Sequence, residues 1–332
     1  MKLLLRVLVS LAVAGVLVVL LARWSGVGVE EVREALGRLT AGCYFAALGV
    51  HVAIYVVRAW RFQVLLGAEA RGSFVGQLGV TLAYGMAGIV LPAKVGELSY
   101  VAYSGRALGV KAGTALAVLV VARVLDLAVL AAGMGVACLV VGGPGWMVPV
   151  GVCGVGLGGV LFAAAWHGEW LVKVGVWCSR KLRLDRWRVG ARGIEKLERM
   201  GAALQIAAQG KRLGQAVVLS VLAWVGVFVF CALLARGLGI GEVGFGEVVF
   251  GSGVAMLATL VPVSAFASVG TLETGWVVGF GVVGVSRELA LATGAGLHVV
   301  QLVNVVALGV VGHLVMGVVG GRRAAGGRTE GR

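Results

Sequence analysis

Long apolar runs make up most of the chain, and charged residues are concentrated in short stretches between them. A membrane-spanning helix needs about 20 predominantly apolar residues. Six runs approach or exceed that length and predict full spans, at 7–22, 40–57, 112–141, 146–166, 213–235 and 289–319. The first run follows two basic residues, as a signal peptide does, but we interpret it as a retained helix because membrane segments continue after it.

Two more apolar regions, 73–110 and 245–285, are each interrupted by proline and by charged or polar residues. The interrupting residues are Pro92, Lys94, Gly96 and Glu97 in the first region, and Pro262, Ser264 and Glu273 in the second. A proline removes a backbone donor, and a charged side chain at the bilayer centre costs about 2.5–3.5 kcal/mol on insertion scales. We therefore predict two broken helical hairpins whose interruptions serve a function.

Composition assigns the chain to the membrane proteins. Hydrophobic residues make up 60% of it, charged residues 13%, and the mean hydropathy is +1.00, which excludes an ordinary soluble domain. The expected fold is an all-α polytopic membrane helix bundle, with one transmembrane domain over 1–321. The five cysteines have no C-x-x-C spacing and no catalytic motif of a soluble enzyme occurs, so we expect no metal, no cofactor and no enzymatic activity.

The distribution of the net charge of +14 predicts orientation rather than nucleic-acid binding. The segment 167–213 carries eleven Lys or Arg against four Asp or Glu, so the positive-inside rule puts it in the cytoplasm. The amino terminus and the basic tail 322–332, which we expect to be disordered, follow the same rule. The segment 167–213 is either an amphipathic helix on the membrane surface or a solvated basic loop.

This orientation predicts how the two broken hairpins lie. In the first half, 1–166, the region 73–110 begins and ends on the cytoplasmic side, as a re-entrant hairpin or as two short spans. In the second half, 214–321, the region 245–285 begins and ends outside. Broken hairpins that enter from opposite faces are typical of an inverted repeat with a ligand site near the midplane.

Charged residues inside the membrane segments are spaced as local pairs. Lys94 and Glu97 are three residues apart, and so are Arg123 and Asp126. Each pair can therefore neutralise itself on one helical face. Alternatively, the two cations bind a lipid phosphate, while the two carboxylates and Glu273 hold them in position or titrate.

Two further groups of polar residues each have a candidate role. The last apolar run carries a polar stripe at helical spacing, made of His298, Gln301 and Asn304. This stripe either lines the same cavity or forms hydrogen bonds between helices. The end of the 40–57 run is followed by aromatic and basic residues, namely Arg58, Trp60 and Arg61. We expect these three to anchor the helix at the membrane interface.

Four short motifs resemble those of a known family. They are Arg58-Ala59-Trp60-Arg61, Leu91-Pro92-Ala93-Lys94-Val95-Gly96-Glu97-Leu98, Arg123-Val124-Leu125-Asp126, and Val261-Pro262-Val263-Ser264 with Glu273. Together they are similar to the motif series of the lysylphosphatidylglycerol synthase transmembrane region, the flippase-like family. The family usually has arginine where this chain has Lys94 and Tyr100, and glutamate where it has Ala122.

The resemblance implies a lipid flippase-like transporter in the plasma membrane, which moves or binds an anionic or isoprenoid-linked lipid headgroup. Relatives that make aminoacylated lipids carry a soluble transferase domain after the membrane region, and we expect this chain, which runs to Arg332, to correspond to the lipid-translocating half alone. The expected partners are membrane lipids and a soluble lipid transferase or glycosyltransferase. Two alternatives stay open: a non-catalytic partner of a lipid-modifying enzyme, and a secondary transporter of a small polar solute.

Overall fold

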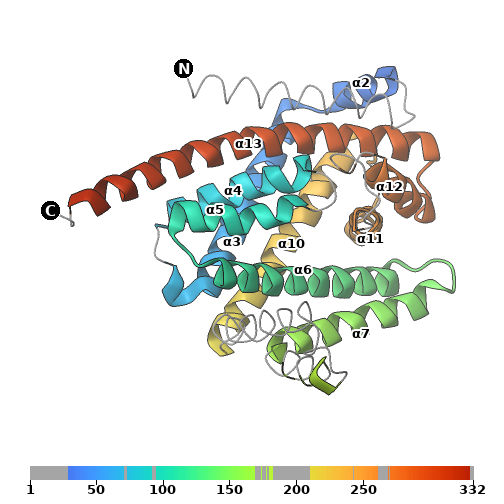
Figure 1. Cartoon of the computed structure of the whole chain (residues 1–332). Coiled ribbons are helices and arrows are strands. Elements are labelled where there is room, and N and C mark those ends of the chain that lie inside the picture. Colours follow the sequence, from blue (N-terminus) through green and yellow to red (C-terminus); the bar gives the residue numbers. More distant parts are fainter. Residues whose placement is uncertain are drawn as a thin grey trace.

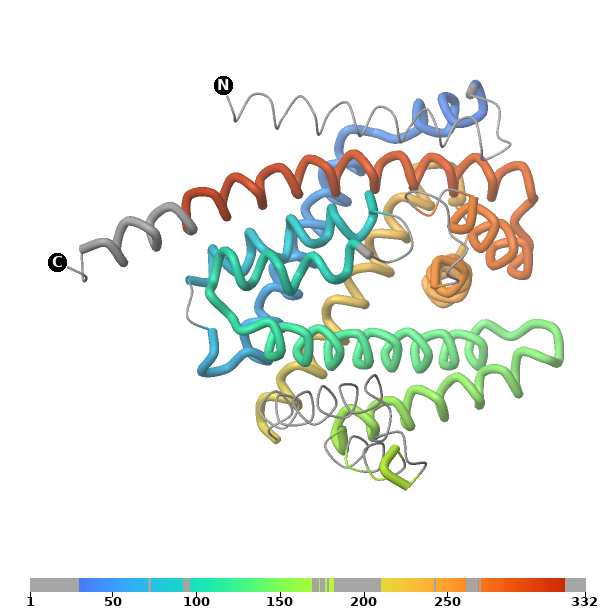
Figure 2. The backbone as a smooth tube through the Cα atoms, viewed as in Figure 1, coloured from blue at the N-terminus to red at the C-terminus, as the bar shows by residue number. Residues whose placement is uncertain are grey.

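The computed structural model describes residues 29–70, 73–91, 95–168, 210–241, 243–260 and 270–329, with isolated positions between them. Within these residues every regular element is a helix (Figures 1 and 2). The predicted span 7–22 and most of the basic segment 167–213 lie outside the described residues. The same is true of Pro92, Lys94, Pro262 and Ser264.

Five helices are long and apolar enough to cross a membrane, and each matches one of the predicted spans. They are α3 (Ala41–Leu66), α6 (Ala112–Val141), α7 (Met147–Trp166), α10 (Gly210–Leu238) and α13 (Arg287–Thr329). The apolar part of α13 ends at Val319. The predicted all-α class is confirmed for the described part of the chain, and the amino-terminal run is the one predicted span that falls outside it.

The helix α3 extends well beyond the apolar run that predicted it. Its amino end is capped by Thr40, whose hydroxyl accepts a hydrogen bond from the backbone N–H of Cys43 at 3.3 Å. The helix then continues to Leu66, where the short 3-10 helix η1 (Gly67–Glu69) follows. Two arginines that were expected at the end of this span therefore lie within its helix.

Antiparallel helix pairs form the body of the bundle. Gly67, after the end of α3, lies beside Arg212 near the start of α10, while Gly237 lies beside Cys43. The helices α6 and α7 form a second pair, in which a Cβ at Gly135 would lie 2.7 Å from the carbonyl oxygen of Gly151. Figure 1 shows α3 and α10 between this second pair and α13.

Two pairs of short helices occupy the regions that were predicted to be broken hairpins. The first pair is α4 (Phe74–Val90) and α5 (Ser99–Leu108), with the 3-10 helix η2 (Val95–Leu98) between them; the second is α11 (Phe245–Ala258) and α12 (Thr271–Val282). The first pair follows the end of α3 and the second follows the end of α10. Because α3 and α10 are antiparallel, the two pairs attach at opposite ends of that helix pair. Re-entry into the membrane and an inverted repeat stay predictions.

Facing glycines let α13 pack closely along α4. A Cβ at Gly312 would lie 2.6 Å from the backbone nitrogen of Ala83 and 2.7 Å from the carbonyl oxygen of Gly79. A Cβ at Gly79 would in turn lie 2.8 Å from the side chain of Val315. Backbones approach this closely where small residues occupy the interface. The contact with α13 therefore fixes the position of the first hairpin.

We expect Gly312→Ala to destabilise the protein, because the added methyl group overlaps the backbone of α4. Overpacking of this kind costs about 1–3 kcal/mol, which lowers the midpoint temperature of unfolding in detergent. The matched control is Gly317→Ala on the same helix, where a Cβ would meet nothing within 4 Å. Its midpoint should stay unchanged or rise slightly, and equal midpoints for the two variants would contradict the packing role of Gly312.

Candidate functional site

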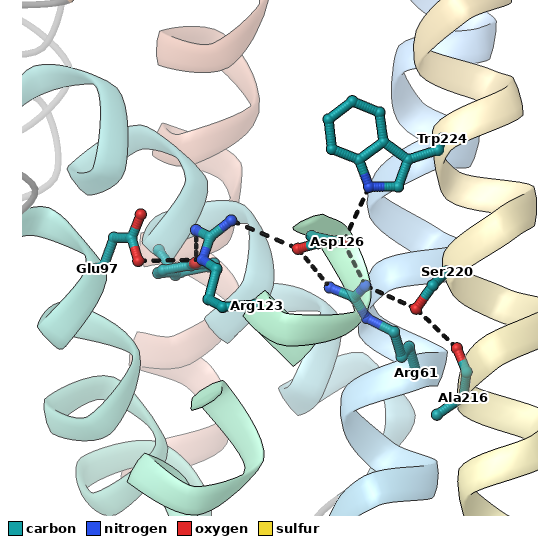
Figure 3. Close-up of polar contacts among 8 residues, drawn as sticks. Arg61, Glu97, Arg123, Asp126, Ala216, Ser220 and Trp224 are labelled. Atoms are coloured by element: carbon teal, nitrogen blue, oxygen red, sulfur yellow. Dashed lines mark hydrogen bonds and ion pairs between the residues drawn. The ribbon is translucent and has the colours of Figure 1, made fainter. Parts of the chain in front are cut away.

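A buried ion pair joins α3 to α6 inside the bundle (Figure 3). Arg61 is 2% exposed and Asp126 is 6% exposed. Nη1 of Arg61 donates to Oδ1 of Asp126 at 2.6 Å, and Nη2 donates to Oδ2 at 3.2 Å, so the contact is bidentate. A buried charge without a partner is strongly destabilising, so each of these side chains makes the burial of the other tolerable.

The helix α10 supports this pair from a third side. The indole N–H of Trp224 donates to Oδ1 of Asp126 at 3.1 Å. The hydroxyl of Ser220 accepts a hydrogen bond from Nη1 of Arg61 at 3.0 Å and donates to the carbonyl oxygen of Ala216 at 2.8 Å. Three long helices thus fix the position and orientation of one carboxylate.

Arg123 extends the network from this pair to the first hairpin. Its Nη1 lies 3.4 Å from Oδ2 of Asp126, which is the local pairing that the sequence suggested. Its Nε lies 3.0 Å from Oε2 of Glu97, and Nη2 donates a close hydrogen bond to the hydroxyl of Tyr84 on α4. The Arg123 side chain is 40% exposed, whereas that of Arg61 is 2% exposed.

A glycine contact brings Glu97 to Arg123. A Cβ at Gly96 would collide with the carbonyl group of Ala87 and with the backbone of Gly88, so η2 lies directly against α4. This close approach explains why the motif has glycine at that position. Glu97 was expected to pair with Lys94, which lies outside the described residues, so that pairing stays a prediction; among the described residues Glu97 pairs with Arg123.

The interface role predicted for Arg61 needs correction. Trp60 is 56% exposed, as expected of an interface residue, but Arg61 is buried against Asp126. Arg58 lies one turn before Arg61, within the electrostatic influence of Asp126 and Arg123, and its Nε is buried without a hydrogen-bond partner. The prediction is wrong for Arg61 because α3 continues past the apolar run and meets a carboxylate there.

We call these five charged residues the arginine cluster: Arg58, Arg61, Glu97, Arg123 and Asp126. The cluster contains three guanidinium groups and two carboxylates, so it carries a formal excess of one positive charge. The spacing of Arg58 and Arg61, one helical turn apart, was the sequence signal that both could face the same side.

A second buried pair joins α12 to α13. Oε1 of Glu273 lies 2.6 Å from Nδ1 of His298, and the two residues are 1% and 2% exposed. The other carboxylate oxygen of Glu273 accepts a hydrogen bond from the backbone N–H of Gly270 at 2.7 Å, which caps α12. Within the described residues, no hydrogen bond or ion pair joins this pair to the arginine cluster.

The remaining members of the polar stripe have different surroundings. Oδ1 of Asn304 accepts a hydrogen bond from the hydroxyl of Tyr44 at 3.0 Å, which links α13 to α3. Nδ2 of Asn304 and Oε1 of Gln301 are buried without a hydrogen-bond partner. In the described part of the chain, no group of three or more His, Cys, Asp or Glu side chains is arranged to hold a metal ion.

The fold and the buried cluster define a class of protein: a multi-pass membrane helix bundle with paired charges in its interior. The chain belongs to the family described as the lysylphosphatidylglycerol synthase TM region, whose model matches residues 5–309. The resemblance seen in the four motifs is therefore confirmed. No curated protein and no solved structure matches the chain.

We expect Asp126→Asn to lower the free energy of unfolding by about 3–5 kcal/mol, because it leaves Arg61 buried without its counter-charge. The matched control is Glu34→Gln on α2 (Val29–Arg38), which breaks an exposed pair with Arg38 at 2.7 Å. Exposed pairs contribute at most about 1 kcal/mol. The measurement is denaturant unfolding in detergent micelles.

The double variant Arg61→Met with Asp126→Asn tests the cause of that loss. It removes the orphaned charge and should unfold at a higher denaturant concentration than Asp126→Asn alone. A double variant that is no more stable than Asp126→Asn alone would contradict the inference that the unpaired charge of Arg61 causes the loss of stability.

Proposed function

We propose that the protein is a lipid flippase-like transporter that binds the anionic or isoprenoid-linked headgroup of a membrane lipid and moves it across the bilayer. The observation that carries this proposal is the excess positive charge of the arginine cluster. A net charge inside a membrane bundle is unfavourable, and a bound anion compensates it. Membership of the family supports a lipid-related role.

Arg123 is the binding group in this proposal. Its side chain is 40% exposed and that of its partner Glu97 is 27% exposed, whereas Arg61 is enclosed. A phosphate can therefore replace Glu97 at Arg123 and form the bidentate contact that guanidinium groups favour. The enclosed pair of Arg61 and Asp126 stays in place and holds Arg123 in position. Lys94, three residues before Glu97, supplies a further cation to the same headgroup.

Movement of the lipid in this proposal uses the two hairpins. They attach at opposite ends of the α3 and α10 pair, which supports re-entrant hairpins related as an inverted repeat around a midplane site. Pro92 and Gly96 break the first hairpin, and Pro262 and Ser264 lie in the break of the second. The protein lies in the plasma membrane, and its cytoplasmic side carries the amino terminus, the segment 167–213 and the carboxyl terminus.

In this proposal the protein is not itself an enzyme. The arginine cluster supplies binding and charge compensation. Chemical modification of the lipid falls to a separate partner, a soluble lipid transferase or a glycosyltransferase.

We expect Arg123→Ala to slow lipid movement about ten- to a hundredfold, because a hydrogen bond to a charged group contributes about 1.5–3 kcal/mol and 1.4 kcal/mol is tenfold. The measurement is the rate at which labelled anionic phospholipids and isoprenoid phosphates change leaflet in vesicles that contain the purified protein. Arg123→Lys keeps the charge but not the bidentate geometry, and should retain part of the rate.

The matched control for this experiment is Arg106→Ala, which removes an exposed cation from α5 in the same hairpin. It should leave the rate unchanged, and an equal loss in both variants would contradict the site. Failure of the intact protein to move any lipid of the panel would contradict the proposed function. Specific binding of these lipids without movement would favour the role of a non-catalytic partner.

A further inference from the structure

A row of polar side chains runs along one face of α3 and ends at the arginine cluster. It consists of Tyr44, His51, Tyr55 and Arg58. These residues occupy positions i, i+7, i+11 and i+14, which lie on one face of an α-helix. At 1.5 Å per residue the row is about 21 Å long, which is most of the roughly 30 Å thickness of a hydrocarbon core.

Several buried polar atoms along this row have no hydrogen-bond partner among the described residues. His51 is 7% exposed, yet its Nδ1 is unpaired, and Nε of Arg58 is unpaired as well. Opposite the row on α13, Asn304 binds the hydroxyl of Tyr44, but its Nδ2 has no partner. Oε1 of Gln301, one turn away on α13, is unpaired too.

The row is continuous with the proposed headgroup site. The rings of His51 and Tyr55 stack with their centroids 5.4 Å apart. The hydroxyl of Tyr55 lies against Gly85 of α4, where an added Cβ would collide with it. The residue before Gly85, Tyr84, accepts a hydrogen bond from Arg123. Polar contacts therefore join the lower part of the row, from His51 and Tyr55, to the helix that carries Tyr84, while Tyr44 and Asn304 lie two turns further along the same face of α3.

The unpaired atoms indicate that the row is not a dry helix contact. An unsatisfied buried polar group is destabilising, and hydrocarbon offers it no replacement partner. Four such atoms on two facing helices add up to a large penalty for a protein that is only marginally stable. Water, or a polar ligand, satisfies groups of this kind in protein interiors. Polar residues that only join helices would bond to each other, as Tyr44 and Asn304 do.

We propose that this face of α3 lines a hydrated path, along which the polar headgroup of a lipid passes between Tyr44 and the arginine cluster. The inference rests on the proposed function and adds the route to it. His51 and Tyr55 form the wall at the middle of the path. Arg58 is a charged binding group at its end, beside Arg123.

Reaction with a charged, membrane-impermeant methanethiosulfonate reagent tests this path in vesicles of phosphatidylcholine and phosphatidylglycerol. The parent protein keeps the buried Cys138 and Cys231 and has Ala in place of Cys43, Cys153 and Cys178. Single cysteines are then introduced as His51→Cys and Tyr55→Cys. These thiols should react about tenfold faster or more than thiols in lipid. The thiolate is the reactive form, an apolar environment raises the pKa of a thiol, and each unit of that rise lowers the thiolate population tenfold.

The matched controls are Phe45→Cys and Val52→Cys, which lie on the outward side of the same helix. Phe45 is 65% exposed and Val52 is 38% exposed on the bundle surface, where we expect them to face lipid. Labelling at position 51 should also slow lipid movement, since the attached group fills the path. The same reagent added to the parent protein should leave the rate of lipid movement unchanged.

The outcomes separate this inference from the proposed function. Labelling at 51 and 55 that is no faster than at 45 and 52, in a parent that moves lipid, would overturn the path and leave the proposed function standing. Fast labelling in a protein that moves no lipid would support the hydrated path and contradict the proposed function. Fast labelling at 51 that blocks lipid movement supports both.

Discussion

Two charges that hydrocarbon would exclude are held together in this bundle, on Arg61 of α3 and Asp126 of α6. Neither is tolerated at that depth without the other, so the pair fixes the relative position of the two helices. The bonds from Ser220 and Trp224 extend this constraint to α10. Arg123 lies one turn before Asp126 on α6 and takes its position from the same pair. The partly exposed Arg123 is therefore positioned by a fully buried ion pair.

The spans and the breaks were predictable because they depend on local patterns. About 20 apolar residues predict a helix of membrane length, and proline with glycine predicts its interruption. The pairing of Arg123 with Asp126 is equally local. Arg61 was misinterpreted because its partner is 65 residues away. A basic residue after an apolar run can extend to the membrane interface or turn into the bundle, and the sequence around it is the same in both cases. The neighbouring Trp60 favoured the interface, and Arg61 turns into the bundle.

For the acidic residues, the sequence predicts that a partner is needed but not which residue it is. A carboxylate within an apolar region must find a partner, so Glu97 and Glu273 were identifiable as paired groups. Their partners were not, because Arg123 and His298 lie on other helices whose rotation is set by packing. Gly96 shows the same limit: its place in a motif is visible in sequence, but the backbone of α4 that it approaches is visible only in the fold.

The helix α13 touches both hairpins. Gly312 packs against α4 of the first, and His298 bonds to Glu273 of the second. These contacts are 14 residues apart on one uninterrupted helix, a distance of about 21 Å. Packed helices move past one another in small sliding steps rather than by bending freely. Both helix pairs are therefore held against one continuous helix, so the separation of their contact points on α13 is set by the length of helix between Gly312 and His298.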